Sequence, residues 1–217
     1  RDLHRLIRRQ RQMCIRDRDI DKLIAGKTAI LFYGEAGIGK TTMLLTIASN
    51  VCKEIYPCIY ISTEDTLHYE RVARDPSRFE NVFFEEIWEF EDLVEYVAKV
   101  LAFTPYKVLF IDSINSLYRL VAHKEEAIST YGFILGLIWR RTLDLEGYWF
   151  ASAQVRAGYR EEDEEIVASG MPILEYWFDP IFYMTYSDGE RVVKVVKPKS
   201  SIERRYIVTE EGIEWIS

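Results

Sequence analysis

The sequence predicts an α/β domain whose central sheet is mostly parallel, is flanked by helices and carries antiparallel strands at its C-terminal end. Two observations lead to this fold class. Short, continuous apolar runs alternate with helical segments as far as residue 153, which is the pattern of strands buried on both faces of a parallel sheet. Beyond residue 180 short strands follow one another directly, and one pair is separated by an Asp-Gly turn typical of a hairpin.

The composition predicts one folded domain that is soluble and cytoplasmic. The chain has 217 residues, of which 48% are hydrophobic and 29% are charged, so it carries enough apolar side chains for a sizeable core. No apolar run approaches the ~18 residues that a membrane span requires, and no secretory segment is evident. The cysteines Cys14, Cys52 and Cys58 are odd in number and lack metal-ligand spacing, which favours reduced thiols in or near the core.

The formal net charge of −7 argues against a protein that acts mainly by binding nucleic-acid phosphates, so any contact with DNA is expected to be local or weak. The segment Arg1–Arg18 is rich in arginine and differs from this acidic background. It is either a basic arm for nucleic acid or a non-native or disordered extension, and the second interpretation is preferred. The folded domain is therefore expected to cover 19–217.

The strongest motif is a phosphate-binding loop between the first strand, expected at 27–33, and a helix that ends near Val51. It fits the pattern G-x-x-x-x-G-K-[ST], in which glycines let backbone N–H groups and a helix N-terminus converge on phosphate. Lys40 is expected to contact the β- and γ-phosphates of ATP, and Thr41 to offer its hydroxyl to Mg²⁺. The expected nucleotide-binding residues are Gly34, Glu35, Ala36, Gly37, Ile38, Gly39, Lys40, Thr41 and Thr42.

The other elements are expected to alternate along the chain. Further strands are predicted at 58–61, 82–84, 107–111 and 147–153, and helices at 66–74, 91–103 and 125–145. The C-terminal strands are predicted at 182–186, 191–196, 202–208 and 212–216, with the hairpin turn at 187–190. Residues 158–170 are polar and acidic without an apolar period, which indicates a functional loop.

Polar residues follow three of these strands, at the sheet edge where α/β proteins bind their ligands. Asp112 follows an apolar strand and is expected to organise Mg²⁺, although a helix N-cap is the simpler alternative. Glu64 follows the second strand and is suited to activate water, although a surface acid would need no such role. Gln154 both donates and accepts hydrogen bonds, as a sensor of the γ-phosphate requires, but a single glutamine is weak evidence.

Taken in order, these motifs resemble the RecA-like recombinase ATPases, and among them the archaeal RadA/RadB group and its paralogues. The strings YISTEDTLHYERV and LFIDSINSLYR are particularly similar to that family, and the resemblance covers about 19–217. It implies a RecA-like core that binds ATP with Mg²⁺ and hydrolyses ATP slowly in an assembly-dependent way. It also implies a core-only paralogue in DNA recombination and repair that self-associates or modulates a RecA-like recombinase partner.

The same resemblance implies two further features. Lys197 and Lys199 match basic residues that the family places against the γ-phosphate of the neighbouring subunit, whereas without the resemblance they are a solvated charge pair on a strand. Residues 157–170 match the second DNA-facing loop of the family. Here the chain departs from the family, because acidic residues fill 161–165 and repel a phosphate backbone. Direct DNA binding is therefore expected to be weak or indirect.

Two alternatives remain open from the sequence. One is a KaiC-like signalling ATPase, although that group carries paired glutamates after the second strand and this chain has Glu64-Asp65. The other is a non-catalytic adaptor that binds nucleotide for structure and acts through its surface. The presence of Lys40, Thr41 and Asp112 beside Glu64 favours the enzyme over the adaptor.

Overall fold

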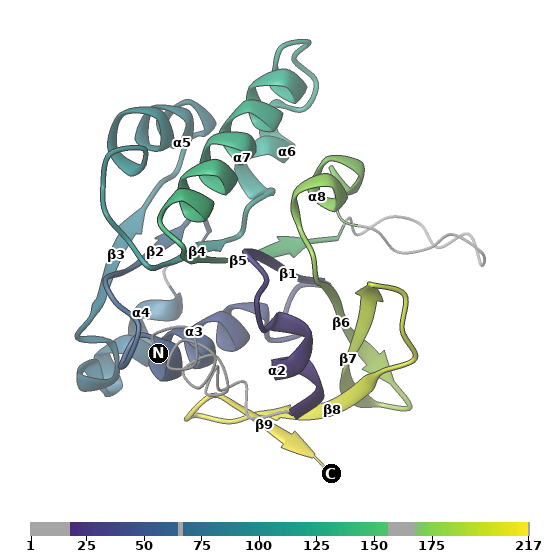
Figure 1. The fold of residues 1–217 in the computed structure, drawn as a ribbon. Coiled ribbons are helices and arrows are strands. Elements are labelled where there is room, and N and C mark those ends of the chain that lie inside the picture. The colour runs from purple at the N-terminus through teal and green to yellow at the C-terminus, as the bar shows by residue number, and fades with distance from the viewer. Residues whose placement is uncertain (1–17, 65–66, 156–167, 169, 217) are drawn as a thin grey trace.

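The computed structural model describes residues 18–64, 67–155, 168 and 170–216. Within these ranges nine strands form one sheet in the order β3-β2-β4-β5-β1-β6-β7-β8-β9 (Figure 1). The pairs among β1 to β6 are parallel, and β6 to β9 are joined by antiparallel pairs. The predicted α/β class, with a mostly parallel sheet and antiparallel C-terminal strands, is confirmed.

The elements follow the expected alternation. The strands are β1 (Ala29–Gly34), β2 (Cys58–Ser62), β3 (Val82–Glu86), β4 (Val108–Asp112), β5 (Tyr148–Gln154), β6 (Ile181–Ser187), β7 (Glu190–Lys197), β8 (Glu203–Val208) and β9 (Ile213–Ile216). The helices are α2 (Arg18–Ile24), α3 (Lys40–Val51), α4 (Leu67–Arg74), α5 (Phe90–Tyr96), α6 (Ser116–Val121), α7 (Ala127–Asp144) and α8 (Met171–Trp177). Short helical turns occupy 76–79 and 97–101.

Helices cover both faces of the sheet (Figure 1), and an apolar core lies on each face. On one face, buried residues of α5, α6, α7 and α8 pack against alternate residues of the strands. On the other face α2 and α3 pack on the intervening residues, among which Phe32, Phe110 and Phe150 are fully buried or nearly so. Because every residue of β1, β2 and β4 is buried, these strands read as continuous apolar runs in the sequence.

The antiparallel part is organised by the predicted hairpin. β6 and β7 are connected at Asp188 and Gly189, whose φ angles are 53° and 80°. Both residues lie in the left-handed region, which Gly tolerates freely and Asp more readily than most residues. The Asp-Gly signal in the sequence therefore located this turn correctly.

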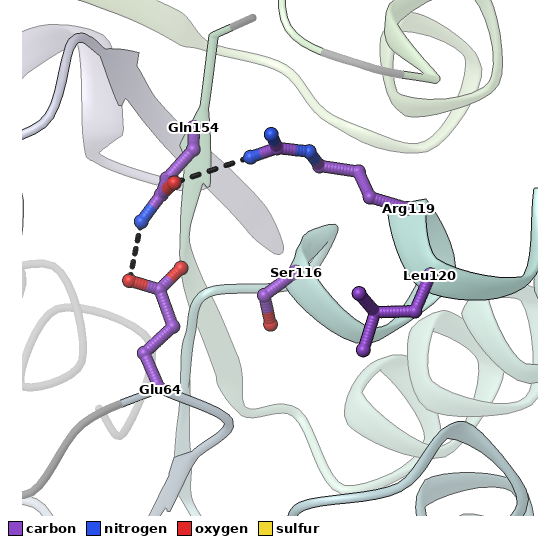
Figure 2. Close-up of a pocket in the computed structure, with 5 residues that line it drawn as sticks. All are labelled: Glu64, Ser116, Arg119, Leu120 and Gln154. Atoms are coloured by element: carbon purple, nitrogen blue, oxygen red, sulfur yellow. Dashed lines mark hydrogen bonds between the residues drawn. The ribbon is translucent and has the colours of Figure 1, made fainter.

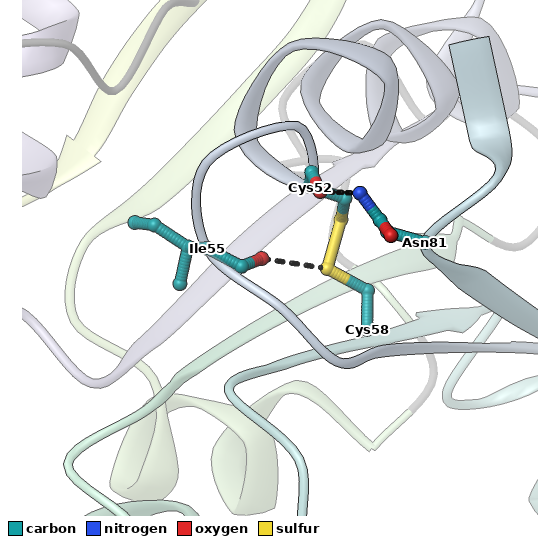
Figure 3. The surroundings of a disulfide bond; sticks show 4 residues. All are labelled: Cys52, Ile55, Cys58 and Asn81. Atoms are coloured by element: carbon teal, nitrogen blue, oxygen red, sulfur yellow. Dashed lines mark hydrogen bonds between the residues drawn. A yellow bond between two sulfur atoms is a disulfide. The ribbon is translucent and has the colours of Figure 1, made fainter. Parts of the chain in front are cut away.

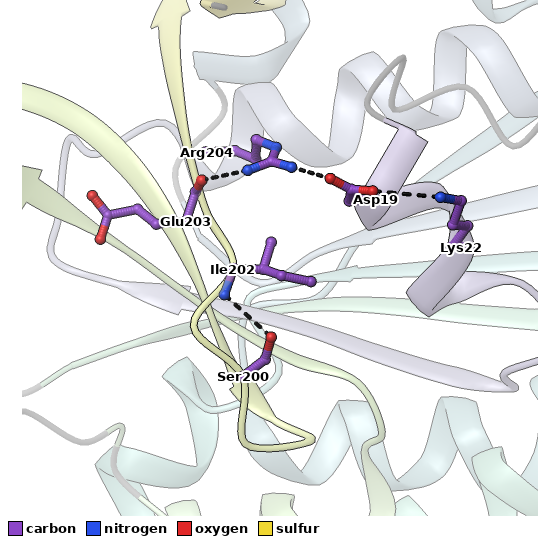
Figure 4. Close-up of polar contacts among 6 residues, drawn as sticks. All are labelled: Asp19, Lys22, Ser200, Ile202, Glu203 and Arg204. Atoms are coloured by element: carbon purple, nitrogen blue, oxygen red, sulfur yellow. Dashed lines mark hydrogen bonds and ion pairs between the residues drawn. The ribbon is translucent and has the colours of Figure 1, made fainter.

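Helix α2, the first helix that the structure describes, contacts this antiparallel part (Figure 4). Asp19 of α2 forms an ion pair with Arg204 of β8 and lies 3.6 Å from the ammonium nitrogen of Lys22. Ile20 and Ile24, on the inner side of α2, are fully buried. The chain thus packs as part of the domain from residue 19 onward, while 1–17 lie outside the described residues and the predicted boundary at 18/19 stays a prediction.

Three expectations about secondary structure need correction. The helices α6 and α8 were not anticipated, because segments of six and seven residues are too short to show a helical period. The helix expected at 91–103 is divided, with an α-helix to Tyr96 and a π-helical turn over 97–101. Each missed helix buries apolar residues beneath it, so tertiary packing rather than local sequence sets its position.

The prediction of reduced cysteines is wrong for two of the three. Cys52 and Cys58 are joined by a disulfide, with their Cα atoms 6.1 Å apart (Figure 3). The carbonyl oxygen of Ile55 lies 3.1 Å from Cys58 Sγ, a position from which it could accept a hydrogen bond from the reduced thiol. The sequence could not show the pairing, because it depends on how the chain folds back between the end of α3 and the start of β2. Cys14 lies outside the described residues.

Within the part of the chain that the structure describes, no helix is both long and apolar enough to cross a membrane.

Candidate functional site

The phosphate loop connects β1 to α3 in the arrangement that the motif predicts. Gly37 and Gly39 have φ angles of 77° and 109°, a left-handed conformation that turns the backbone into the first turn of α3. Gly34 has no space for a side chain, since a Cβ atom there would lie 2.2 Å from the carbonyl oxygen of Met184 on β6. The glycines are therefore required by backbone shape and by the neighbouring strand, and the loop presents its N–H groups at a helix N-terminus.

Lys40 lies inside this loop with only 7% of its surface exposed. Its ammonium group donates hydrogen bonds to the carbonyl oxygens of Gly34, at 3.0 Å, and Glu35, at 2.8 Å. Burial lowers the pKa of Lys40, and the negative charges of Glu64 and Asp112 oppose that shift. A buried ammonium in a loop that leads into a helix N-terminus is suited to bind phosphate oxygens.

Asp112 lies at the carboxyl end of β4 and is 5% exposed. One carboxylate oxygen accepts a hydrogen bond of 2.9 Å from the hydroxyl of Tyr60, and the other accepts one from Ser152. Burial and the nearby Asp112 raise the pKa of Tyr60 well above its usual value, so Tyr60 is a donor here. These neighbours fix Asp112 within the sheet, in place of the helix N-cap that the sequence left open.

Thr41 follows Lys40 in the first turn of α3 and is partly buried. Its hydroxyl and the carboxylate of Asp112 are oxygen donors, the ligand type that Mg²⁺ prefers, especially where phosphate and water complete the shell. The donor chemistry of the two residues therefore fits the predicted metal.

The side chains of Glu64 and Gln154 meet at the edge of the sheet (Figure 2). One oxygen of Glu64 accepts a hydrogen bond from the Gln154 side-chain amide, and the other accepts one from Ser113. The amide oxygen of Gln154 in turn accepts a hydrogen bond of 3.1 Å from Arg119. The structure thus brings together two of the residues predicted from separate strand ends.

A cavity of about 460 Å³ is lined by Glu64, Ser116, Arg119, Leu120 and Gln154 (Figure 2). Its charged lining residues are the acidic Glu64 and the cationic Arg119. It leaves room for water next to the group expected to activate it.

Sequence reasoning missed three residues that act on Gln154 and Glu64: Ser113, Asn115 and Arg119. The amide of Asn115 bonds both backbone groups of Gln154, each at 2.9 Å, and Asn115 is fully buried. The sequence contains a pattern that could have predicted two of them. Asn115 and Arg119 follow a strand and are four residues apart, a spacing that puts two side chains on the same side of a helix.

Lys197 and Lys199 lie apart from this cavity. The Lys197 ammonium donates to the carbonyl oxygens of Glu175, at 2.6 Å, and Phe178, at 3.0 Å, at the C-terminal end of α8. Lys199 is exposed beyond the end of β7. The acidic segment 161–165 of the predicted DNA-facing loop lies outside the described residues.

Comparison with known proteins finds one family profile and several DNA repair proteins to which the chain is similar. A family profile described as an AAA domain matches residues 26–127, which include the phosphate loop and Asp112. A DNA repair and recombination protein RadB of Archaeoglobus fulgidus is 28% identical over 216 aligned residues, covering 90% of this chain and 94% of that protein. A DNA repair and recombination protein RadB of Methanococcus maripaludis is 24% identical over 203 residues, which cover 89% of this chain and 94% of that protein. A DNA repair protein RadA of Campylobacter jejuni is 30% identical over 108 residues, covering 47% of this chain and 23% of that protein.

Proposed function

We propose that this chain, which is similar to an AAA domain profile and to RadB proteins, is a RecA-like P-loop ATPase that binds ATP with Mg²⁺ and hydrolyses ATP at its terminal phosphate. The observation that carries the proposal is the position of the Glu64 carboxylate, which Ser113 and Gln154 hold beside an open cavity. The negative charge of Glu64 also opposes the effect of burial, which lowers the pKa of Lys40 in the phosphate loop.

Each residue has a role that its chemistry supports. The loop from Gly34 to Thr42 binds the phosphates through backbone N–H groups, and Lys40 neutralises charge on the β- and γ-phosphates. Thr41 and Asp112 would hold Mg²⁺, directly or through water, and the bound ion would supply positive charge to the phosphate oxygens. Glu64 accepts the proton of the attacking water, for which a carboxylate in a partly dry site is suited.

Gln154 is proposed as the residue that reports whether the γ-phosphate is present. Its amide reaches Glu64 from the end of β5, and β5 lies next to β1, which enters the phosphate loop. The amide of Gln154 would contact Glu64 when the γ-phosphate is absent and a phosphate oxygen when it is present, so its partner distinguishes the two nucleotide states.

The proposed setting is DNA recombination and repair, in keeping with the names of the RadB relatives. We place the protein as a paralogue that assembles with itself or with a RecA-like recombinase and modulates that partner, while its own contact with DNA is weak or indirect. The net charge of −7 supports the indirect role.

Lys197 and Lys199 are proposed to act on the γ-phosphate of a neighbouring subunit. For Lys197 this role requires the ammonium to leave the carbonyl oxygens of Glu175 and Phe178, whereas Lys199 is already exposed. If the proposal is right, Lys199→Met lowers turnover in the assembled protein without changing its stability. Equal turnover by the variant and the unaltered protein would remove Lys199 from the mechanism.

The main experiment measures ATP binding and phosphate release by the full chain with Mg²⁺, with and without single-stranded DNA. Glu64→Gln should abolish turnover and keep ATP affinity, because it removes the base and preserves the shape of the site. Glu95→Gln is the control, since Glu95 is an exposed acid paired with Lys99 on the surface. ATP binding without turnover under all assembly conditions, in the unaltered protein, would favour the non-catalytic adaptor instead.

A further inference from the structure

Gln154, the last residue of β5, lies beyond the point where β5 stops pairing with its neighbour β4. The pairing between β4 and β5 ends at Ile111 with Ala151, while β5 continues to Gln154. On the other side β1 still pairs with Gln154 through Gly34. The backbone of Gln154 therefore has a strand neighbour on only one side and needs another partner on the side of β4.

The segment after β4 supplies that partner. The Asn115 side chain donates to the Gln154 carbonyl oxygen and accepts from the Gln154 N–H, both at 2.9 Å. This pair reproduces the two hydrogen bonds that a neighbouring strand would make. Asn115 thus fixes the backbone of Gln154 and leaves its side chain to be positioned by other groups.

The side-chain amide of Gln154 lies between two groups of opposite hydrogen-bonding capacity. Arg119, one helical turn beyond Asn115, only donates, and it contacts the amide oxygen at 3.1 Å. The ionised carboxylate of Glu64 only accepts, and it contacts the amide nitrogen. A flipped amide would place oxygen against carboxylate and NH₂ against guanidinium, so both contacts select the same orientation.

We propose that Arg119 is a positioning residue that fixes the Gln154 amide against Glu64, and through Gln154 orients the Glu64 carboxylate for hydrolysis. This inference rests on the proposed function for its effect on turnover, but not for the contact itself. Without Arg119 the amide keeps only its contact with Glu64, and the carboxylate loses a fixed neighbour. Arg119 does not touch the reacting atoms.

The kinetic test compares Arg119→Ala with the unaltered protein. We expect kcat to fall about tenfold while ATP affinity stays the same, because the lost contact orients the base and does not bind phosphate. Arg119→Lys, which keeps a donor, should recover part of the loss. Arg140→Ala is the control, since Arg140 is an exposed arginine paired with Asp144 on α7.

A double variant separates positioning from a general structural effect. If Arg119 acts through Gln154, Arg119→Ala should cause no further loss of kcat in a Gln154→Ala background. A further loss of similar size there, or an unchanged or raised kcat in the single variant, would overturn the inference.

A spectroscopic test addresses the contact when ATP turnover is absent. The side-chain NH₂ signals of Gln154 in a ¹⁵N spectrum of the nucleotide-free protein are identified by their loss in Gln154→Ala. In Arg119→Ala we expect them to move toward the position of a solvent-exposed glutamine. Unmoved signals would refute the positioning role even if the protein hydrolyses ATP, and moved signals in a protein without turnover would refute only the proposed function.

Discussion

The hydroxyl of Tyr60, in the middle of β2, donates a 2.9 Å hydrogen bond to the carboxylate of Asp112 at the end of β4. Tyr60 and Asp112 are both on the face of the sheet that α3 covers, because Tyr60 pairs in register with Phe110 and side chains alternate along a strand. A buried aromatic residue of the core thus also fixes the carboxylate proposed to organise Mg²⁺.

Replacing Tyr60 by Phe should weaken this support. We expect the free energy of unfolding to fall by about 1–3 kcal/mol, because the carboxylate is left with an unpaired oxygen in a buried site. We also expect ATP binding to require a higher Mg²⁺ concentration. Chemical denaturation and a Mg²⁺ titration of ATP binding measure the two effects.

Tyr106→Phe is the matched control for that variant. Tyr106 is also buried and bonds Thr142 at 2.9 Å, but it is separate from the nucleotide site. It should lose stability and keep its Mg²⁺ dependence. An equal change of Mg²⁺ dependence in both variants would show that Tyr60 has no specific effect on Asp112.

The affinity for ATP should depend on pH through Lys40. Burial lowers the pKa of Lys40 from 10.5, so this ammonium loses its proton at a lower pH than an ordinary lysine. Below the lowered pKa the charge is present and binds phosphate, and as the pH rises through it the charge is lost. ATP affinity should therefore fall in the alkaline range below pH 10.5, measured by calorimetry at several pH values. Constant affinity across that range would contradict a charge-dependent role.

The burial of Lys40 also predicts whether replacing it by Met raises or lowers the stability of the nucleotide-free protein. Because the folded pKa is below the unfolded value, the charged form is disfavoured by folding at neutral pH. Lys40→Met should consequently unfold at a temperature no lower than the unaltered protein when nucleotide is absent. It should also lose the stabilisation that ATP gives, which a thermal shift assay measures. A large loss of stability without nucleotide would mean that the bonds to Gly34 and Glu35 outweigh the cost of burial.

Two glycine substitutions should have opposite effects on stability. Gly34→Ala places a Cβ atom 2.2 Å from the Met184 carbonyl oxygen in a paired strand, so we expect a loss of about 3 kcal/mol. Gly132→Ala meets no atom within 4 Å and lies in α7, so we expect a gain of up to about 1 kcal/mol. Denaturant unfolding of both variants gives the comparison, and a loss in Gly132→Ala would mean that the helix surface is packed differently.

The disulfide predicts the number of thiols that react in the unfolded protein. With Cys52 and Cys58 joined, only Cys14 should react with a thiol reagent before reduction, and all three cysteines after it. If all three react without reductant, the cysteines are reduced as their spacing suggested.

Much of this protein followed from the sequence alone. Each buried strand of the parallel sheet is a continuous apolar run, and the phosphate loop is fixed by glycines and Lys40 at invariant spacing within its motif. The positions of Asp112, Glu64 and Gln154 at one edge of the sheet could be predicted, because the strands of a parallel sheet end at the same edge. The Asp-Gly turn was likewise encoded locally, by two residues that tolerate positive φ.

Only the tertiary structure decided which other side chains contact Gln154 and Asp112. Arg119 contacts Gln154 across 35 positions of the chain, and Tyr60 contacts Asp112 across 52. No local pattern carries such pairs, because they arise from the order in which the strands assemble and from how far each extends past its neighbour. The positions of the short helices α6 and α8 depend on the same long-range packing, whereas the disulfide depends on how the chain folds back between α3 and β2. The sequence therefore determined the motif and the chemistry of its residues, and the assembled sheet determined their orientation.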